Sequence, residues 1–81
     1  MNDTPKTIQI TYCSECGLLE DALNLMNFIQ SGFGIPVELI EGHAGIFEIS
    51  MNGKVIYNNN NSATMVPTEG EVLDILTKYN K

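Results

Sequence analysis

The chain has 81 residues, of which 43% are hydrophobic and 17% charged, and its net charge is −6 at pH 7. This length allows one small domain over residues 1–81, and the composition is that of a globular protein rather than a disordered one. Ten acidic residues against four basic ones argue against nucleic acid and anionic membranes as partners, because binding phosphate groups requires clustered lysine and arginine.

The first predicted element is a strand that leads into the two cysteines of the chain. Ile8, Ile10 and Tyr12 alternate with polar residues, which predicts a half-buried strand with Tyr12 in the core. Cys13 and Cys16 follow directly in the sequence Cys-Ser-Glu-Cys. The pair therefore lies where the strand ends.

A helix from about residue 16 to residue 31 is predicted next. Apolar residues recur there at helical spacing. These residues are Leu18, Leu19, Ala22, Leu23, Met26 and Ile29. Gly32 and Gly34 are expected to end the helix, because glycine readily adopts the left-handed conformation of a helix end.

The second half of the chain predicts three strands. Pro36 opens a strand over 37–41, and a loop follows over 41–45. Asn52-Gly53 is a strong hairpin signal and predicts antiparallel strands over about 46–51 and 54–58.

A polar tract over 58–61 and the residues 62–64 after it predict a loop before the last element. Thr68 and Glu71 then form a capping box, with Pro67 just before it. This signature predicts a helix that runs to the C-terminus.

These elements give the order β-α-β-β-β-α. The first strand and the strand after the helix should be parallel, joined by a right-handed crossover. The alternating first strand indicates that one sheet face is covered, so both helices are expected on the same side. We predict an α/β, thioredoxin-like two-layer sandwich with a four-stranded mixed sheet.

The spacing of Cys13 and Cys16 suits dithiol–disulfide exchange. Unpaired N–H groups and the dipole at a helix start would stabilise a Cys13 thiolate, and Cys16 could then resolve a mixed disulfide. Glu15 opposes this effect by its charge, and Ser14 and Glu15 are candidate modulators. His43, in the loop before the third strand, is a further candidate that could stabilise a thiolate or carry a proton, unless it is a solvent-exposed loop residue.

The Cys13–Cys16 pair has three alternative interpretations. A structural disulfide over four residues would contribute roughly 2 kcal/mol. A structural zinc site needs four ligands, and Cys13, Cys16 and His43 supply only three. Two inert packed thiols are a further alternative. We expect no cofactor and no metal.

The N-terminal sequence shows no signal peptide, and no apolar segment approaches the roughly 20 residues that span a bilayer. A cytoplasmic protein is therefore expected. Because thiols stay mostly reduced in the cytoplasm, a CxxC pair there favours exchange chemistry or metal binding over a structural role.

The sequence resembles the selenoprotein W-like (Rdx) family of small thioredoxin-fold proteins. The resemblance rests on I-x-I-x-Y-C-x-x-C-G at 8–17, V-E-L-I-E-G-H-A-G-I-F-E-I at 37–49, N-G-K-V-I-Y at 52–57 and the tail V-P-T-E-G-E-V-L-D-I-L. It implies a redox role for the CxxC pair. In many relatives selenocysteine stands at the position of Cys16, which implies that Cys16 reacts first, whereas the helix argument favours Cys13.

The resemblance also implies partners: glutathione or a thioredoxin-type reductant, and a partner protein. One departure weakens a transfer of glutathione binding, because Glu20, Asp21, Asn24 and the run 58–61 stand where relatives often carry basic residues. A second departure concerns how a substrate is gripped, because the 41–45 loop lacks the proline that faces the CxxC of thioredoxins.

Three hypotheses for the function remain open. The first is a thiol–disulfide oxidoreductase or redox sensor that uses Cys13 and Cys16. The second is a redox-responsive interaction module without turnover, in which the loops around His43 and Asn59 bind a protein. The third is a metal-binding adaptor that uses the two thiols in a dimer.

Overall fold

A computed structural model of the chain describes residues 7–59 and 66–79. Its elements, in chain order, are β1 (Ile8–Cys13), the short 3-10 helix η1 (Ser14–Cys16), α1 (Leu19–Phe33), β2 (Val37–Gly42), β3 (Phe47–Met51), β4 (Lys54–Asn58) and α2 (Glu69–Tyr79). The predicted order of strands and helices is confirmed. Most of the predicted loop over 58–64 lies outside the described residues, as do the last two residues of the predicted C-terminal helix.

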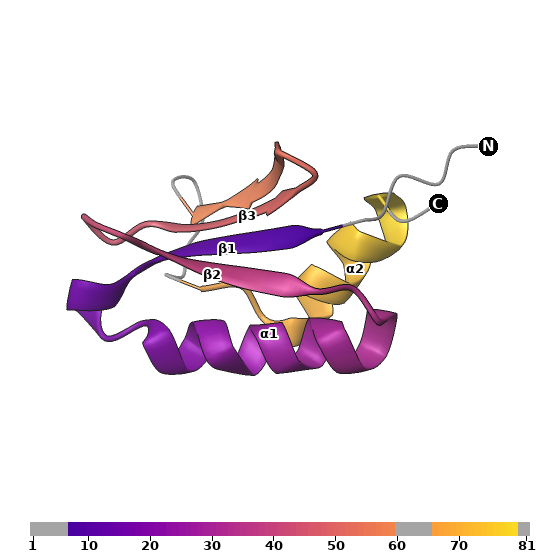
Figure 1. The fold of residues 1–81 in the computed structure, drawn as a ribbon, viewed down its shortest axis with the longest axis horizontal. Helices are drawn as coiled ribbons and strands as arrows, with labels where there is room; N and C mark the ends of the chain where they lie inside the picture. The colour runs from indigo at the N-terminus through magenta and orange to yellow at the C-terminus, as the bar shows by residue number, and fades with distance from the viewer. Residues whose placement is uncertain (1–6, 60–65, 80–81) are drawn as a thin grey trace.

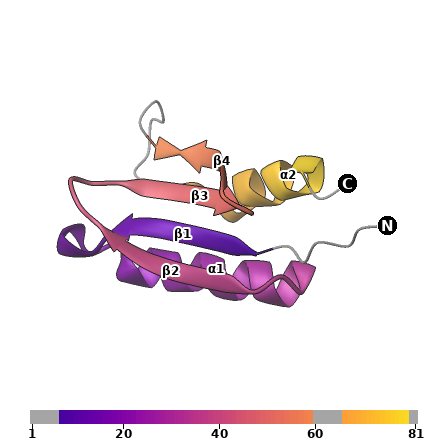
Figure 2. The same cartoon turned by 45° about the horizontal axis from the view of Figure 1, so that its top comes forward.

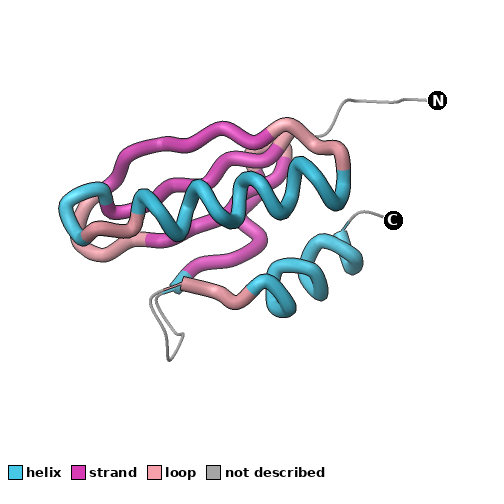
Figure 3. Tube along the Cα trace, turned by 90° about the horizontal axis from the view of Figure 1, so that it is seen from below, coloured by secondary structure: helices cyan, strands magenta, loops and turns pink. Residues whose placement is uncertain are grey.

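The four strands form one mixed sheet with the order β2-β1-β3-β4. The strand β1 runs parallel to β2 and antiparallel to β3, and β4 continues the sheet as a hairpin with β3. Both helices cover the same face of the sheet (Figures 1 and 2), and Figure 3 shows α1 in front of the strands when seen from below, with α2 beside it. The end of β1 that carries the first cysteine is therefore flanked by a strand on each side.

The hydrophobic core lies between the sheet and the two helices. Three residues of β1 lie opposite three residues of β3, and all six are buried: Ile8 with Met51, Ile10 with Ile49, and Tyr12 with Phe47. The helices add Ala22, Leu25, Ile29, Val72 and Leu76. Burying each large apolar side chain contributes about 1.5–3 kcal/mol, so this layer holds the sheet and the helices together.

The other face of the sheet carries pairs of polar side chains. Gln9 donates a hydrogen bond from Nε2 to Glu38 Oε1 (3.1 Å) and accepts one at Oε1 from Ser50 Oγ (3.5 Å). Asn58 Nδ2 donates to Glu48 Oε1 at 2.9 Å. This alternation of apolar and polar faces is what a two-layer sandwich with one covered face requires.

Helix α1 differs from its prediction at both ends. It begins at Leu19 rather than near residue 16, because Gly17 adopts a left-handed conformation that interrupts the helix. It continues through Gly32 to Phe33, whose side chain packs against the core, and it ends at Gly34, which is left-handed. Gly34 is thus the stop that the sequence predicted, and Gly32 is not.

Two local signals of the sequence are confirmed. Asn52 and Gly53, at φ 52° and 85°, form the tight turn between β3 and β4. Thr68 and Glu71 form the capping box of α2. The Glu71 N–H donates to Thr68 Oγ1 at 3.1 Å, and the Thr68 N–H donates to Glu71 Oε1 at 2.9 Å. No helix within the described ranges is long and apolar enough to cross a lipid bilayer.

Candidate functional site

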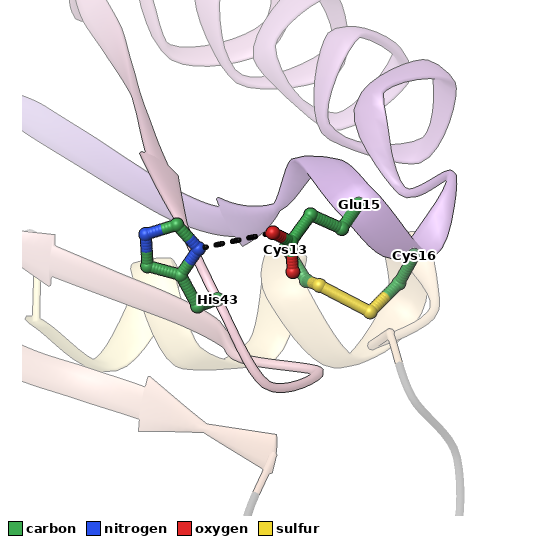
Figure 4. A network of polar contacts seen from close by, with 4 residues as sticks. All are labelled: Cys13, Glu15, Cys16 and His43. Atoms are coloured by element: carbon green, nitrogen blue, oxygen red, sulfur yellow. Dashed lines mark ion pairs between the residues drawn. A yellow bond between two sulfur atoms is a disulfide. The ribbon is translucent and has the colours of Figure 1, made fainter.

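Cys13 and Cys16 are joined by a disulfide at the end of β1 (Figure 4). Their Cα atoms are 5.3 Å apart, which is within the range that a disulfide spans. Cys13 is the last residue of β1 and is fully buried, whereas Cys16 ends η1 and is exposed. The two sulfurs of the bond therefore belong to residues in different surroundings, one inside the protein and one at its surface.

A tight turn brings the second cysteine back to the first. The Gly17 N–H donates to the Ser14 carbonyl and the Leu18 N–H donates to the Cys13 carbonyl, both at 3.4 Å. Gly17 has φ 77°, a conformation that costs other residues about 1–2 kcal/mol. The sequence Cys-Ser-Glu-Cys-Gly thus encodes the turn as well as the disulfide.

The sequence predicted that the helix begins at about residue 16, at the second cysteine. In the structure the pair lies before α1. The Cys13 N–H donates to the carbonyl of Ile46, just before β3, at 2.9 Å, so this donor has a partner. Cys16 precedes the start of α1 at Leu19. Any helix-start effect on Cys13 would come from the single turn of η1, whose N-cap residue is Cys13, and not from α1.

The connection from β2 to β3 crosses the end of β1 beside the disulfide. Gly42, which was predicted to lie in a loop, is the last residue of β2 and pairs with Cys13. A turn follows in which Ala44 and Gly45 both have positive φ, and the Ile46 N–H donates to the His43 carbonyl at 3.2 Å. This turn carries Ile46 into contact with the Cys13 backbone.

Asn59, directly after β4, holds the crossing turn through its side chain. Its Oδ1 accepts a hydrogen bond from the Phe47 N–H at 3.1 Å, and its Nδ2 donates to the Gly45 carbonyl at 2.8 Å. Sequence reasoning placed Asn59 in a polar tract and missed this role. An asparagine directly after a strand is a weak signal for side-chain bonding to the backbone, since asparagine favours such bonds in turns.

The candidate modulators lie around the pair. His43 Nδ1 is 3.6 Å from Glu15 Oε2, and their side chains are 79% and 69% exposed (Figure 4). The structure thus brings His43 next to the CxxC turn, where its partner is Glu15 rather than a sulfur atom. Ser14 is exposed, and its backbone carbonyl accepts the turn bond from Gly17.

A metal site would need further ligands besides the two cysteines. Within residues 7–59 and 66–79, no three or more His, Cys, Asp and Glu side chains are grouped so that they could hold a metal ion. The two sulfurs are bonded to each other in this structure. The chemistry that this arrangement offers directly is cleavage and re-formation of one disulfide bond.

Comparisons with known proteins agree with the fold. Residues 7–78 match the sequence model of the Rdx family. Among solved structures, a protein from Bordetella parapertussis has a TM-score of 0.86 and 25% identity, covering 94% of this chain and 99% of that one. A selenoprotein W-related protein from Vibrio cholerae has a TM-score of 0.87 and 22% identity, covering 96% and 100%. No curated protein matches the chain. The predicted thioredoxin-like sandwich and the resemblance drawn from the motifs are confirmed.

Proposed function

Because the chain belongs to the Rdx family and its two cysteines are close enough to form a disulfide, we propose that it is a small thiol–disulfide redox protein. In this proposal Cys13 and Cys16 alternate between a disulfide and two thiols. The observation that carries it is the bond itself, which joins a buried cysteine to an exposed one.

Exposure selects the sulfur that exchanges with a partner. A partner thiolate attacks Cys16 Sγ in line with the S–S bond, which breaks and leaves the electron pair on Cys13. A mixed disulfide between the partner and Cys16 results. A second partner thiolate attacks the partner's sulfur in this mixed disulfide, so that the two partner thiols become one disulfide. The protein gains two electrons, and both of its thiolates take up protons.

The reverse direction uses the same atoms. The Cys16 thiolate attacks a partner disulfide, one partner thiolate leaves, and Cys13 then attacks Cys16 to release the other. This assignment of Cys16 as the sulfur that meets the partner agrees with the family resemblance. It differs from the argument based on a helix start, which favours Cys13.

The finer parts of the proposal concern location and partners. We place the protein in the cytoplasm, where a thiol pool keeps such a pair exchanging. The electrons come from glutathione or a thioredoxin-type reductant, and the substrate is a protein. The exposed position of Cys16 at the surface of the sandwich supports a partner that docks from outside.

A redox titration read by thiol-specific mass tagging tests the proposal. We expect the protein to gain two tags in one step, at a potential between about −320 and −180 mV, the range of cellular glutathione pools. A variant with serine at both cysteines gives the untagged baseline. Failure of Cys13 and Cys16 to form an intramolecular disulfide under mild oxidant would overturn the proposal.

A second function, a redox-responsive interaction module, is favoured by one observation. The turn after β2 is tied to the pair through Gly42 and the Ile46 carbonyl, so a change at the disulfide reaches this loop directly. Turnover separates the two functions. Reduction of many equivalents of a small disulfide per protein, with a continuous thiol supply, supports the enzyme, and a single stoichiometric change supports the module.

A further inference from the structure

The surface around Cys16 is acidic. Glu15 lies inside the CxxC turn, Glu20 lies in the first turn of α1, and Glu41 lies in β2 opposite Tyr12, next to the pair. All three glutamates are exposed. Three carboxylates therefore lie on the turn, the helix and the strand that are next to Cys16.

The lysines that the structure describes lie at the opposite end of the molecule. Lys54 pairs with Met51, which lies opposite Ile8 at the far end of β1. Lys78 is in the last turn of α2, and Figure 1 shows that end of α2 at the opposite end of the molecule from η1. The residues 60–65 contain no charged side chain. Near the pair, the one side chain of the described residues that can carry positive charge is His43, which faces Glu15.

Two exposed leucines lie next to these carboxylates. Leu19 is 46% exposed and Leu23 is 37% exposed. They are four residues apart on α1, so their side chains are neighbours on one face, and this face begins three residues after Cys16. A polypeptide partner can cover this apolar surface, whereas a small polar thiol leaves it in water.

From this arrangement we infer the substrate class of the pair: cysteines in positively charged polypeptide segments that also carry an apolar side chain next to the cysteine. The inference rests on the proposed function, since it concerns exchange at Cys16. It also predicts discrimination against anionic thiols, so of the two reductants named above it favours the thioredoxin-type protein over glutathione. Opposite charges about 7 Å apart in water attract by enough to change a rate about two- to threefold for each pair.

The first test compares two small disulfides that differ in charge: cystamine, which is cationic, and glutathione disulfide, which is anionic. The fully reduced protein is mixed with each, and the exchange rate is followed at low and high salt. Salt should slow the reaction with cystamine and speed the reaction with glutathione disulfide, because screening weakens attraction and repulsion alike. The sign of the salt effect does not depend on the intrinsic reactivity of either disulfide.

A matched pair of double variants locates the charges responsible. Glu15→Gln with Glu20→Gln should lower the cystamine-to-glutathione rate ratio at low salt by about fivefold or more, because each lost carboxylate changes both rates in opposite directions. Glu38→Gln with Asp74→Asn changes the net charge equally on exposed residues away from the pair, and the ratio should stay within twofold. Taking the ratio cancels any change in the reactivity of Cys16 itself.

Peptide disulfides test whether the substrate cysteine needs an apolar neighbour that contacts Leu19 and Leu23. The symmetrical disulfide of Lys-Leu-Cys-Leu-Lys should react several-fold faster than that of Lys-Ser-Cys-Ser-Lys, and Leu19→Ser with Leu23→Ser should remove this difference without changing the cystamine rate. Equal rates for the two peptides, or the same salt effect on cystamine and glutathione disulfide, would overturn the inference and leave the proposed function standing. Absence of exchange with every probe would overturn both.

Discussion

Gly42 lies directly opposite Cys13 in the parallel pairing of β2 with β1, at a point where no side chain fits. A Cβ atom at Gly42 would lie 2.7 Å from Ile46 Cγ2 and 3.0 Å from Thr11 Cγ2. Ile46 is also the residue whose carbonyl holds the Cys13 N–H. The missing side chain thus lets three segments meet beside the disulfide.

Replacing Gly42 by alanine should therefore destabilise the protein. The Ile46 and Thr11 side chains must shift to make room, and overpacking of this kind costs about 1–3 kcal/mol in the free energy of unfolding, measured by urea denaturation. Gly32→Ala is the matched control, because a Cβ there meets no atom within 4 Å. The control should be neutral or stabilising by up to about 1 kcal/mol, since alanine favours a helix. Similar losses in both variants would contradict the role given to Gly42.

Asn59→Ala should loosen the turn that crosses the disulfide. The change removes the acceptor of the Phe47 N–H and the donor to the Gly45 carbonyl, and each backbone group left without a partner costs about 1–3 kcal/mol where it is buried. Amide hydrogen exchange at Phe47 should become faster together with the loss of stability. Asn58→Ala is the control, because its Nδ2 bonds the side chain of Glu48. Unchanged amide hydrogen exchange at Phe47 in Asn59→Ala would show that Asn59 does not hold the turn.

Thr68→Ala should destabilise α2 by about 1 kcal/mol, because the Glu71 N–H loses its capping acceptor. Chemical denaturation measures the change. Thr77→Ala is a useful comparison within the same helix, where the threonine hydroxyl donates to the Leu73 carbonyl at 2.7 Å. This second change should be neutral or slightly stabilising, since alanine is the better helix former. If the cap contributed nothing, Thr68→Ala and Thr77→Ala would have the same free energy of unfolding.

The parts of the fold that could be predicted from sequence are those encoded by neighbouring residues. Asn52-Gly53 and the Thr68–Glu71 box each specify their turn through contacts within a few residues. The same holds for the alternation in β1, which placed Tyr12 in the core. Such signals need no knowledge of distant segments, and for that reason they were reliable.

The features that the sequence did not predict depend on tertiary contacts. The buried stripe of α1 includes Ala22, Leu25 and Ile29, whereas Leu19 and Leu23 are exposed. Periodicity alone allows either set of residues to face the core. The position of the sheet decides which set is buried. Extension of β2 through Gly42 likewise depends on pairing with Cys13, which no local pattern reveals. At the site, the sequence predicted the cysteines and the nearby His43 but not the two hydrogen bonds by which Asn59 holds the turn.

Tyr57→Phe should be neutral or stabilising by about 1 kcal/mol. The hydroxyl of Tyr57 is buried and has no hydrogen-bond partner within the part of the chain that the structure describes. Removing a polar group that lacks a partner also removes its desolvation cost, and the ring that packs against the core is kept. Thermal unfolding checks this result. A loss of more than about 1 kcal/mol would show that the hydroxyl does have a partner.

Single serine variants should identify the exchanging sulfur. With Cys13→Ser, the exposed Cys16 should form a mixed disulfide with cystamine that persists, because no second thiol is present to resolve it. With Cys16→Ser, the remaining thiol belongs to the fully buried Cys13 and should react at least about tenfold more slowly, since access limits thiol exchange. Mass spectrometry after a timed acid quench measures both adducts, and the same experiment in denaturant should remove the difference. If folded Cys16→Ser forms its adduct as fast as Cys13→Ser, burial does not protect Cys13, and the order of attack proposed for the pair is wrong.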